Sequence, residues 1–251
     1  MIYDIVAPIY DHANKEVDYK EWANFIENIS KRHGGVEPEL VLDLACGTGS
    51  MTIEFAKRRY DMIGIDISVE MLNVAKERAA DAGVSDNILW LCQDMREFEL
   101  YGTVDLVVSC LDSVNHLTSC KDLRNCFSLV RNYLNIEGLF LFDINGRGKF
   151  ERVYADKSYV IEDDQSFCIW QNYYNSKNKT CDFYITMFEE NKDGSYSRYD
   201  EHQRERMYTL KTIKRMLVEC GLSFVGAYSD YNFAEATDDN DRIYIVAKKE
   251  R

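Results

Sequence analysis

Val41-Leu-Asp-Leu-Ala-Cys-Gly-Thr-Gly-Ser-Met-Thr52 decides the fold, because a hydrophobic strand runs straight into a turn of small residues and the start of a helix. Gly47 and Gly49 lack a Cβ, so the backbone can turn tightly and approach a ligand closely. Thr48 or Ser50 can supply a hydroxyl oxygen that caps the helix. The junction predicts a site for a nucleotide-like ligand, and the alternative is a pair of glycines that serve the turn alone.

The third glycine of the dinucleotide-binding fingerprint separates two cofactor classes, since it lets the helix pack closely on its strand. Counting from Gly47, that position is Thr52. Because this glycine is missing, the sequence gives a nicotinamide dehydrogenase less support than the functions described below.

Two further strand-like stretches carry an acid near their ends. Asp66 ends the stretch 61–66 and is followed by Ser68, an expected helix N-cap, while Asp94 lies in the stretch 88–95. In doubly wound folds an acid about 20 residues beyond the glycine turn bonds the ribose hydroxyls. Asp66 is therefore expected to bind ribose, and local capping of the helix is the alternative.

Taken in order, these motifs resemble those of the class I S-adenosylmethionine-dependent methyltransferases. The first motif of that family is an acid, three residues, a glycine, one residue and a glycine, which Asp43, Gly47 and Gly49 match. The resemblance spans residues 41–145. It implies S-adenosylmethionine as cofactor, S-adenosylhomocysteine as product, and no required metal. It further implies that Asp94 bonds the adenine amino group and that Met95 flanks the adenine ring.

An N-terminal segment with Tyr3 and Tyr10 resembles the lid of small-molecule members of the family, and packing of a surface arm is the alternative. A tyrosine face can attract a sulfonium by a cation–π interaction. The full set of expected cofactor-binding residues is Tyr3, Tyr10, Asp43, Ala45, Cys46, Gly47, Gly49, Asp66, Ile67, Met71, Gln93, Asp94, Met95, Cys110 and Leu111.

Strand and helix patterns alternate through five units up to residue 143, which predicts an α/β fold with helices covering a parallel sheet. We expect a doubly wound, mostly parallel seven-stranded sheet whose last strand lies antiparallel beside the fifth, as in the family. After residue 145 the pattern changes to β-rich runs joined by polar turns, which predict an antiparallel meander. The expected organisation is a cofactor domain of residues 1–145 and 209–251 with an inserted substrate cap of residues 146–208.

Candidate substrate-binding and catalytic residues lie in two places. Asp112, Asn115 and His116 follow the fourth strand, where cofactor and substrate are expected to meet. In the cap, His202, Arg204 and Arg206 alternate along one strand and so share one face. His202 could accept a proton and the arginines could hold a carboxylate, while a solvated charged strand is the alternative. The candidate catalytic residues are His116, His202 and Tyr10, and a base is needed only for a protonated acceptor.

Composition narrows the partners. The formal net charge is -13, which disfavours nucleic acid as a substrate. The eight cysteines show no paired spacing, so a reduced protein of the cytoplasm is expected. No apolar run approaches the length of a membrane span. A small-molecule acceptor and a monomer or homodimer are expected.

The expected function is S-adenosylmethionine-dependent methyl transfer to nitrogen or oxygen of a small molecule by direct displacement. The alternative is a non-catalytic sensor or assembly protein that binds S-adenosylmethionine or S-adenosylhomocysteine.

Overall fold

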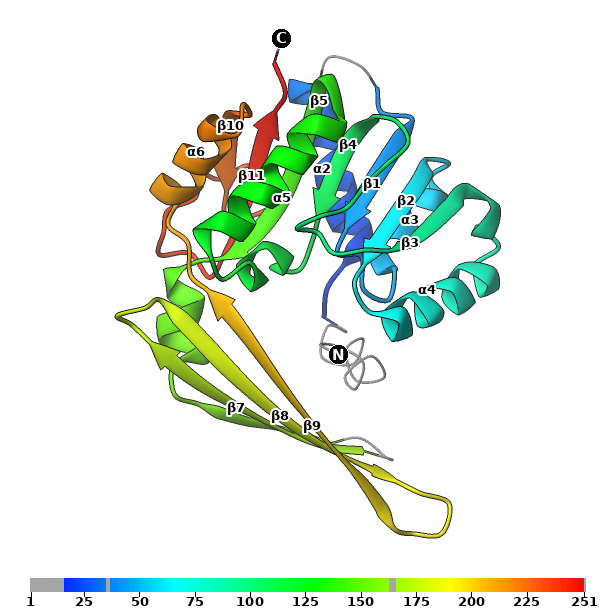
Figure 1. Ribbon diagram of the computed structural model, residues 1–251, viewed down its shortest axis with the longest axis vertical. Helices are drawn as coiled ribbons and strands as arrows, with labels where there is room; N and C mark the ends of the chain where they lie inside the picture. Colours follow the sequence, from blue (N-terminus) through cyan, green and yellow to red (C-terminus); the bar gives the residue numbers. More distant parts are fainter. Residues whose placement is uncertain (1–15, 35–36, 163–165, 251) are drawn as a thin grey trace.

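The computed structural model describes residues 16–34, 37–162 and 166–250. Two sheets organise these residues (Figure 1). A seven-stranded sheet has the order β10-β11-β5-β4-β1-β2-β3, and a four-stranded sheet, β6-β7-β8-β9, extends from one end of it. The seven strands are β1 Leu40–Leu44, β2 Asp61–Asp66, β3 Ile88–Cys92, β4 Val104–Ser109, β5 Leu134–Asn145, β10 Ser223–Tyr228 and β11 Arg242–Lys248.

Parallel pairing joins β1 to β2 and β4, β2 to β3, and β4 to β5. The last strand, β11, lies antiparallel between β5 and β10. The predicted mostly parallel seven-stranded sheet, its antiparallel last strand and the antiparallel insertion are therefore confirmed.

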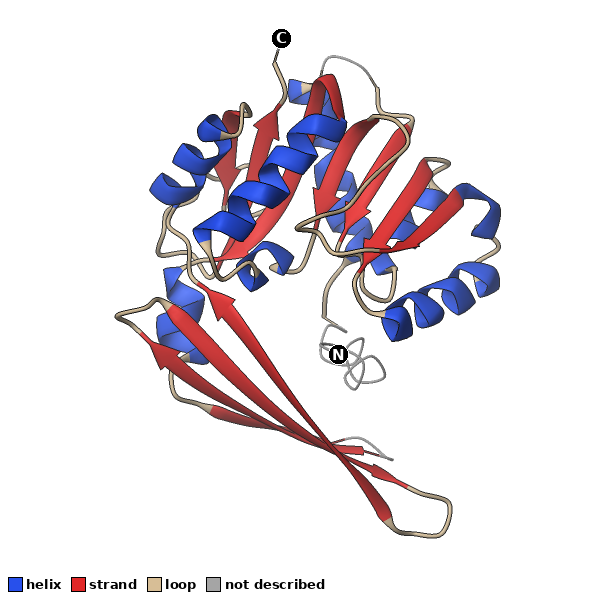
Figure 2. Cartoon of the chain, in the orientation of Figure 1, coloured by secondary structure: helices blue, strands red, loops and turns tan. Residues whose placement is uncertain are grey.

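Helices cover both faces of the large sheet (Figure 2). One core contains Phe127 of α5 and Leu217 of α6, and the other contains Phe25 of α2 and Phe55 of α3. The helices are α2 Tyr19–His33, α3 Ser50–Lys57, α4 Val69–Asp81, α5 Cys120–Tyr133 and α6 Leu210–Glu219, with short helices η1 Ser85–Asn87, η2 Ser113–His116 and η3 Lys149–Tyr154. Among the described residues, none of these helices has the length and apolar character needed to cross a membrane.

The two predicted helix starts have different outcomes. Ser68 is the N-cap of α4, and its hydroxyl accepts a hydrogen bond from the Met71 amide, as predicted. The prediction that Thr48 or Ser50 caps α3 is wrong. Gly49 is the N-cap, in a left-handed conformation with φ of 76°, and no side chain caps this end. The Thr48 hydroxyl instead accepts a hydrogen bond from Arg78.

The inserted sheet is an antiparallel meander of β6 Ser158–Glu162, β7 Ser166–Asn175, β8 Thr180–Glu190 and β9 Tyr196–Arg206. Burial alternates along its strands. In β8 the side chains of Phe183 and Ile185 are buried and that of Tyr184 between them is exposed. Phe183 packs edge-to-face on Tyr154 of η3, with ring centroids 4.8 Å apart. The buried face of the insertion therefore rests on the helix that follows β5.

Candidate active site

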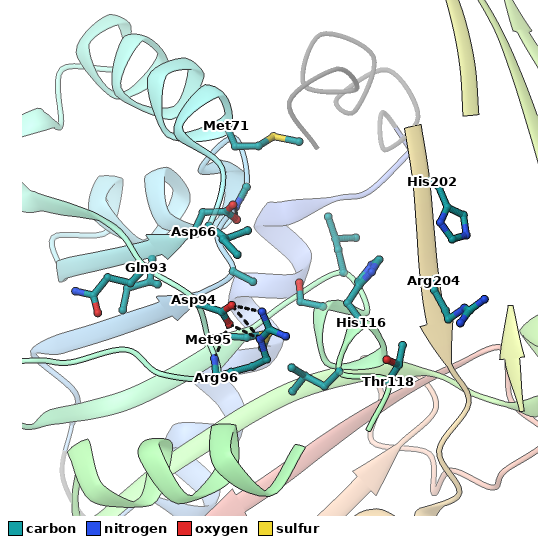
Figure 3. Close-up of a pocket in the computed structure, with 17 residues that line it drawn as sticks. Asp66, Met71, Gln93, Asp94, Met95, Arg96, His116, Thr118, His202 and Arg204 are labelled. Carbon is teal, nitrogen blue, oxygen red and sulfur yellow. Dashed lines mark hydrogen bonds and ion pairs between the residues drawn. The ribbon is translucent and has the colours of Figure 1, made fainter. Parts of the chain in front are cut away.

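A cavity of about 400 Å³ lies beyond the carboxyl ends of the parallel strands, between the large sheet and β9. Figure 3 shows residues of the large sheet on one side of it and β9 on the other. Open α/β sheets bind their ligands at this edge. The lining residues are Ala45, Gly47, Ile65, Asp66, Ile67, Met71, Gln93, Asp94, Met95, Arg96, Leu111, Ser113, His116, Leu117, Thr118, His202 and Arg204.

The turn after β1 brings backbone, rather than long side chains, to this cavity. Ala45, Gly47 and Gly49 all have positive φ, at 62°, 55° and 76°. Glycine adopts this region freely, whereas alanine does so at a cost of roughly 1–3 kcal/mol. The Cys46 amide donates a hydrogen bond to the Ile65 carbonyl, which ties the turn to the end of β2.

Asp66 holds the glycine turn against α4. Its Oδ2 accepts from the Gly47 amide at 2.8 Å and its Oδ1 accepts from the Ser68 amide at 2.9 Å. Burial raises the pKa of this carboxyl, and the amide bonds partly offset that effect. A carboxylate has about four lone-pair sites, so both oxygens keep capacity to accept bonds from ligand hydroxyls.

Asp43 lies beneath the turn. It is 1% exposed, and the Thr52 hydroxyl donates a hydrogen bond to its Oδ2 at 2.5 Å. Burial raises its pKa to about 7, although the Thr52 bond opposes the rise. A small cavity of about 20 Å³ adjoins Asp43 together with Cys46 and Cys110. Burial also raises the pKa of both thiols, which keeps them protonated.

Asp94 and Met95 follow β3 and line the cavity, as expected from the sequence. Arg96, which sequence reasoning missed, donates from its guanidinium to both Asp94 oxygens. Burial acts to raise the pKa of Asp94, but the Arg96 bonds outweigh it and hold that pKa below its usual value. Asp94 therefore stays ionised, and the Arg96 amide also donates to its Oδ1 at 2.8 Å.

The turn after β4 supplies the opposite end of the cavity. Leu111 and Asp112 both have left-handed backbones, with φ of 57° and 53°, and η2 then carries His116 to the lining. Asn115 does not line the cavity. It is fully buried, donates to the Arg206 carbonyl at 2.8 Å and accepts from the Asn145 amide at 2.9 Å. This side chain joins η2 to β5 and β9.

Beside His116 is a partly buried polar cluster that sequence reasoning did not find. Oxygen or nitrogen atoms of Asp112, His116 and Glu205 lie within 4.8 Å of one another, and His116 Nε2 is 4.0 Å from Glu205 Oε1. Asn145 donates to Glu205 Oε2 at 3.1 Å. The available signal was the alternation along β9, since Glu201, Gln203 and Glu205 share the face opposite His202.

The shared face predicted for His202, Arg204 and Arg206 is confirmed by their exposure pattern on β9, but Arg206 does not reach the cavity. Arg206 donates to the Thr118 carbonyl. Asp182 accepts from Arg204 through both oxygens and lies 2.7 Å from His202 Nε2. In Figure 3 the labelled His202 and Arg204 side chains extend from β9 on the side away from Asp66 and Met95.

The remaining expectations divide by position. Tyr3 and Tyr10 lie outside the described residues. Gly49 does not line the cavity. It packs against the Trp90 ring, since a Cβ at this position would lie 2.7 Å from that ring. The lining residues absent from the sequence-based candidates are Ile65, Arg96, Ser113, Leu117 and Thr118.

The donors and acceptors fit an adenosine-containing cofactor. Asp66 offers acceptors for vicinal hydroxyls, Asp94 offers acceptors for an amino group, and Ile67 and Met95 supply apolar surface in a cavity of the size that binds small ligands. The sheet order and the cavity together define the class I S-adenosylmethionine-dependent methyltransferase architecture.

Comparison with known proteins agrees. A family model described as a methyltransferase domain matches residues 41–138. YqeM of Bacillus subtilis (strain 168), a protein named as a methyltransferase, is 32% identical over 252 residues, which cover 100% of this chain and 98% of YqeM. An S-adenosylmethionine-dependent methyltransferase from Clostridium acetobutylicum ATCC 824 has a solved structure that matches with a TM-score of 0.86, at 30% identity and 99% coverage of both chains. This chain belongs to the S-adenosylmethionine-dependent methyltransferase family.

Proposed function

We propose that the protein transfers the methyl group of S-adenosylmethionine to nitrogen or oxygen of a small molecule by direct displacement. The observation that carries this proposal is one continuous cavity that runs from the acids Asp66 and Asp94 to His116. S-adenosylmethionine supplies an activated methyl group on its sulfonium. The cavity gives the two reactants a shared, partly enclosed space, and alignment of this kind can contribute roughly 7–11 kcal/mol to catalysis.

Within this proposal, Asp66 accepts hydrogen bonds from the ribose hydroxyls and Asp94 accepts from the adenine amino group, while Ile67 and Met95 flank the base. Asp43 and the backbone of Ala45 shape the floor under the methionine part. Residues 146–208 act as the substrate cap, because β9 forms one wall of the cavity. The domain boundaries at 145 and 209 follow from this division.

Relatives whose names give an acceptor include both a nitrogen and an oxygen methyltransferase, and so do not choose the reacting atom. The glycine/sarcosine N-methyltransferase of Halorhodospira halochloris is 24% identical over 239 residues. The malonyl-[acyl-carrier protein] O-methyltransferase of Anoxybacillus flavithermus is 30% identical over 126 residues, which cover 49% of this chain. The net charge of -13 and the eight free cysteines further support a cytoplasmic enzyme with no nucleic-acid substrate.

The proposal is tested in two stages. Calorimetry measures the dissociation constants of S-adenosylmethionine and S-adenosylhomocysteine for the wild type, Asp66→Asn and the control Asp61→Asn. Asp61 begins the same strand at its exposed end. We expect Asp66→Asn to weaken binding by about tenfold or more, because a charge-assisted acceptor is lost, and Asp61→Asn to leave it unchanged.

In the second stage, methyl-labelled S-adenosylmethionine and the protein are incubated with bacterial extract, which is then separated into small-molecule, protein and nucleic-acid fractions. Label in the small-molecule fraction that depends on Asp66 supports the proposal. Label in a macromolecular fraction overturns the small-molecule acceptor, and tight binding without any label favours a sensor.

A further inference from the structure

The strongest unassigned feature is the cluster of Asp112, His116, Asn145 and Glu205, which we call the acidic wall. It is assembled from four elements: the turn after β4, η2, the end of β5 and β9. His116 belongs to both the acidic wall and the cavity lining, and Asp112 lies in sequence between two lining residues, Leu111 and Ser113. The wall therefore adjoins the cavity through His116, while Asp112, Asn145 and Glu205 lie behind the lining residues.

Negative charge is concentrated in this wall. The Asp143 carboxylate lies behind Asp112 and accepts from the Asp112 amide at 3.0 Å and from Arg242 at 2.7 Å. The second Arg242 nitrogen reaches Asp112 at only 3.4 Å. The Arg242 guanidinium therefore faces two carboxyl groups, those of Asp112 and Asp143, while the positive charge that acts on Glu205 is that of Lys149. An uncompensated buried charge is costly, so the wall favours a proton or a bound cation.

The protonation pattern follows from burial. Burial first, and then the charge of Asp112, raise the pKa of Glu205 well above its usual value, and the two carboxyls share a hydrogen bond. Burial therefore favours the neutral form of the Glu205 carboxyl. Burial lowers the pKa of His116 although Asp112 opposes this, so its ring is neutral and able to accept a proton. The other charged or titratable groups that face the wall are Asp143, Lys149, Tyr154 and Arg242.

A second, independent observation is a shortage of hydrogen-bond donors. The Asn145 amide donates to Glu205 and to the Tyr154 hydroxyl, but its Oδ1 has no partner among the described residues although the side chain is fully buried. Asp143 Oδ1 is likewise buried and unpartnered. Buried acceptors without donors are rare and call for a ligand or water that donates. An ammonium group carries up to three donors, no acceptor and a positive charge, and so matches the negative charge and the excess of acceptors in this wall.

We infer that the methyl acceptor is a primary or secondary amine, which binds as an ammonium ion against the carboxylate of Asp112 beside Glu205 and loses a proton to His116. This inference rests on the proposed function and names the class of its substrate. Glu205 is a positioning residue, since the hydrogen bond that it shares with Asp112 fixes the orientation of that carboxyl group.

The reaction balances with no further reagent. The ammonium gives one proton to the neutral imidazole of His116, which frees a nitrogen lone pair. The nitrogen forms a bond to the methyl carbon as the carbon–sulfur bond breaks, and the bonding pair stays on sulfur, which becomes a neutral thioether. The product is a methylated ammonium ion. His116, whose side chain is 21% exposed, then releases its proton to solvent.

The labelled small-molecule fraction described above gives the test. The extract is first treated with N-hydroxysuccinimidyl acetate, which acetylates amines and leaves alcohols largely unmodified. We expect the treatment to abolish the label and the untreated labelled product to bind a cation-exchange resin at pH 7. A labelled product that survives acetylation or is released by mild alkali would assign an oxygen acceptor and overturn the inference. Absence of label from every fraction would overturn the proposed function itself, and the amine inference with it.

Variants then locate the amine. With the purified amine, Asp112→Asn is expected to raise KM by about tenfold or more, since a charge-assisted bond is lost, with the S-adenosylmethionine dissociation constant unchanged. Glu205→Gln keeps a neutral donor and is expected to keep KM within about threefold, whereas Glu205→Ala is expected to raise it. Asp61→Asn controls for the change in net charge. An unchanged KM in folded Asp112→Asn overturns the assignment.

One competing occupant has its own signature. Two carboxylates and a histidine can also ligate a divalent cation. Turnover that is abolished by EDTA and restored by Mg²⁺, Mn²⁺ or Zn²⁺, with cation affinity reduced in Asp112→Asn, would assign the acidic wall to a metal and overturn the ammonium site. Turnover unaffected by EDTA supports the ammonium.

Discussion

The Thr52 hydroxyl donates to Asp43 Oδ2 at 2.5 Å, and both side chains are buried. Thr52 occupies the position where a dinucleotide-binding turn has its third glycine, so the residue that argues against a dehydrogenase also holds the first acid of the methyltransferase motif. The bond opposes the effect of burial on the Asp43 carboxyl, whose pKa is raised to about 7 from 3.8.

Stability should therefore depend on pH through Asp43. The folded state binds this proton more tightly than the unfolded state, so the contribution of Asp43 to the free energy of unfolding is full below pH 3.8 and decreases as pH rises to about 7. Thr52→Val removes a hydrogen bond that lowers the pKa of Asp43, so the folded-state pKa rises further. The decrease in the free energy of unfolding then continues to higher pH. Urea unfolding should show a larger difference between wild type and Thr52→Val at pH 8 than at pH 5. The Asp43→Asn background should abolish that dependence, and an equal difference at both pH values would contradict the argument.

Gly64 in β2 should tolerate no side chain. A Cβ there would lie 2.6 Å from the Trp90 ring, whereas a Cβ at Gly102 would meet nothing within 4 Å. We expect Gly64→Ala to lower the free energy of unfolding by about 1–3 kcal/mol through overpacking, and Gly102→Ala to change it by less than about 0.5 kcal/mol. Denaturant titration compares them. Restored stability in Gly64→Ala/Trp90→Leu would identify the ring as the cause.

Asn115 should matter for folding more than for substrate binding. Its side chain bonds the Arg206 carbonyl and the Asn145 amide in a fully buried position, and Asn115→Ala would leave both groups unpaired. We expect a loss of about 2–5 kcal/mol of unfolding free energy, compared with almost none for Asn178→Ala in an exposed turn. Thermal unfolding monitored by circular dichroism measures both, and equal melting temperatures would refute this role.

The two candidate histidines should differ in their effect on turnover. His202 is paired with Asp182 and stacks on Tyr184 with ring centroids 4.6 Å apart, while His116 adjoins the acidic wall. We expect His116→Gln to reduce kcat by about 100-fold, the lower range for loss of a general base, and His202→Gln to change it by less than about threefold. Initial rates of S-adenosylhomocysteine release with the purified amine measure the effect. A larger loss in His202→Gln would return the base role to the cap.

Local sequence patterns were sufficient for the large sheet and the cofactor end of the cavity. Alternating strand and helix periodicity, the glycine turn, and acids at strand ends depend on neighbours along the chain. The Ser68 cap followed for the same reason. Proximity of Asp66 to Gly47 was predictable because the carboxyl ends of adjacent parallel strands meet at one edge of a sheet.

The acceptor end of the cavity depended on tertiary structure. Alternation along β9 showed that Glu205 and His202 face opposite ways, but the pattern alone could not say which face meets the cofactor domain. That choice is made by packing of Phe183 on Tyr154. Arg242, about a hundred residues beyond Asp143, reaches it only because β11 lies beside β5. Local patterns therefore determined the fold and the edge of the sheet at which the cofactor binds. Long-range packing determined which charged groups lie near the acceptor, because the burial and pKa values of these groups depend on segments distant in the chain.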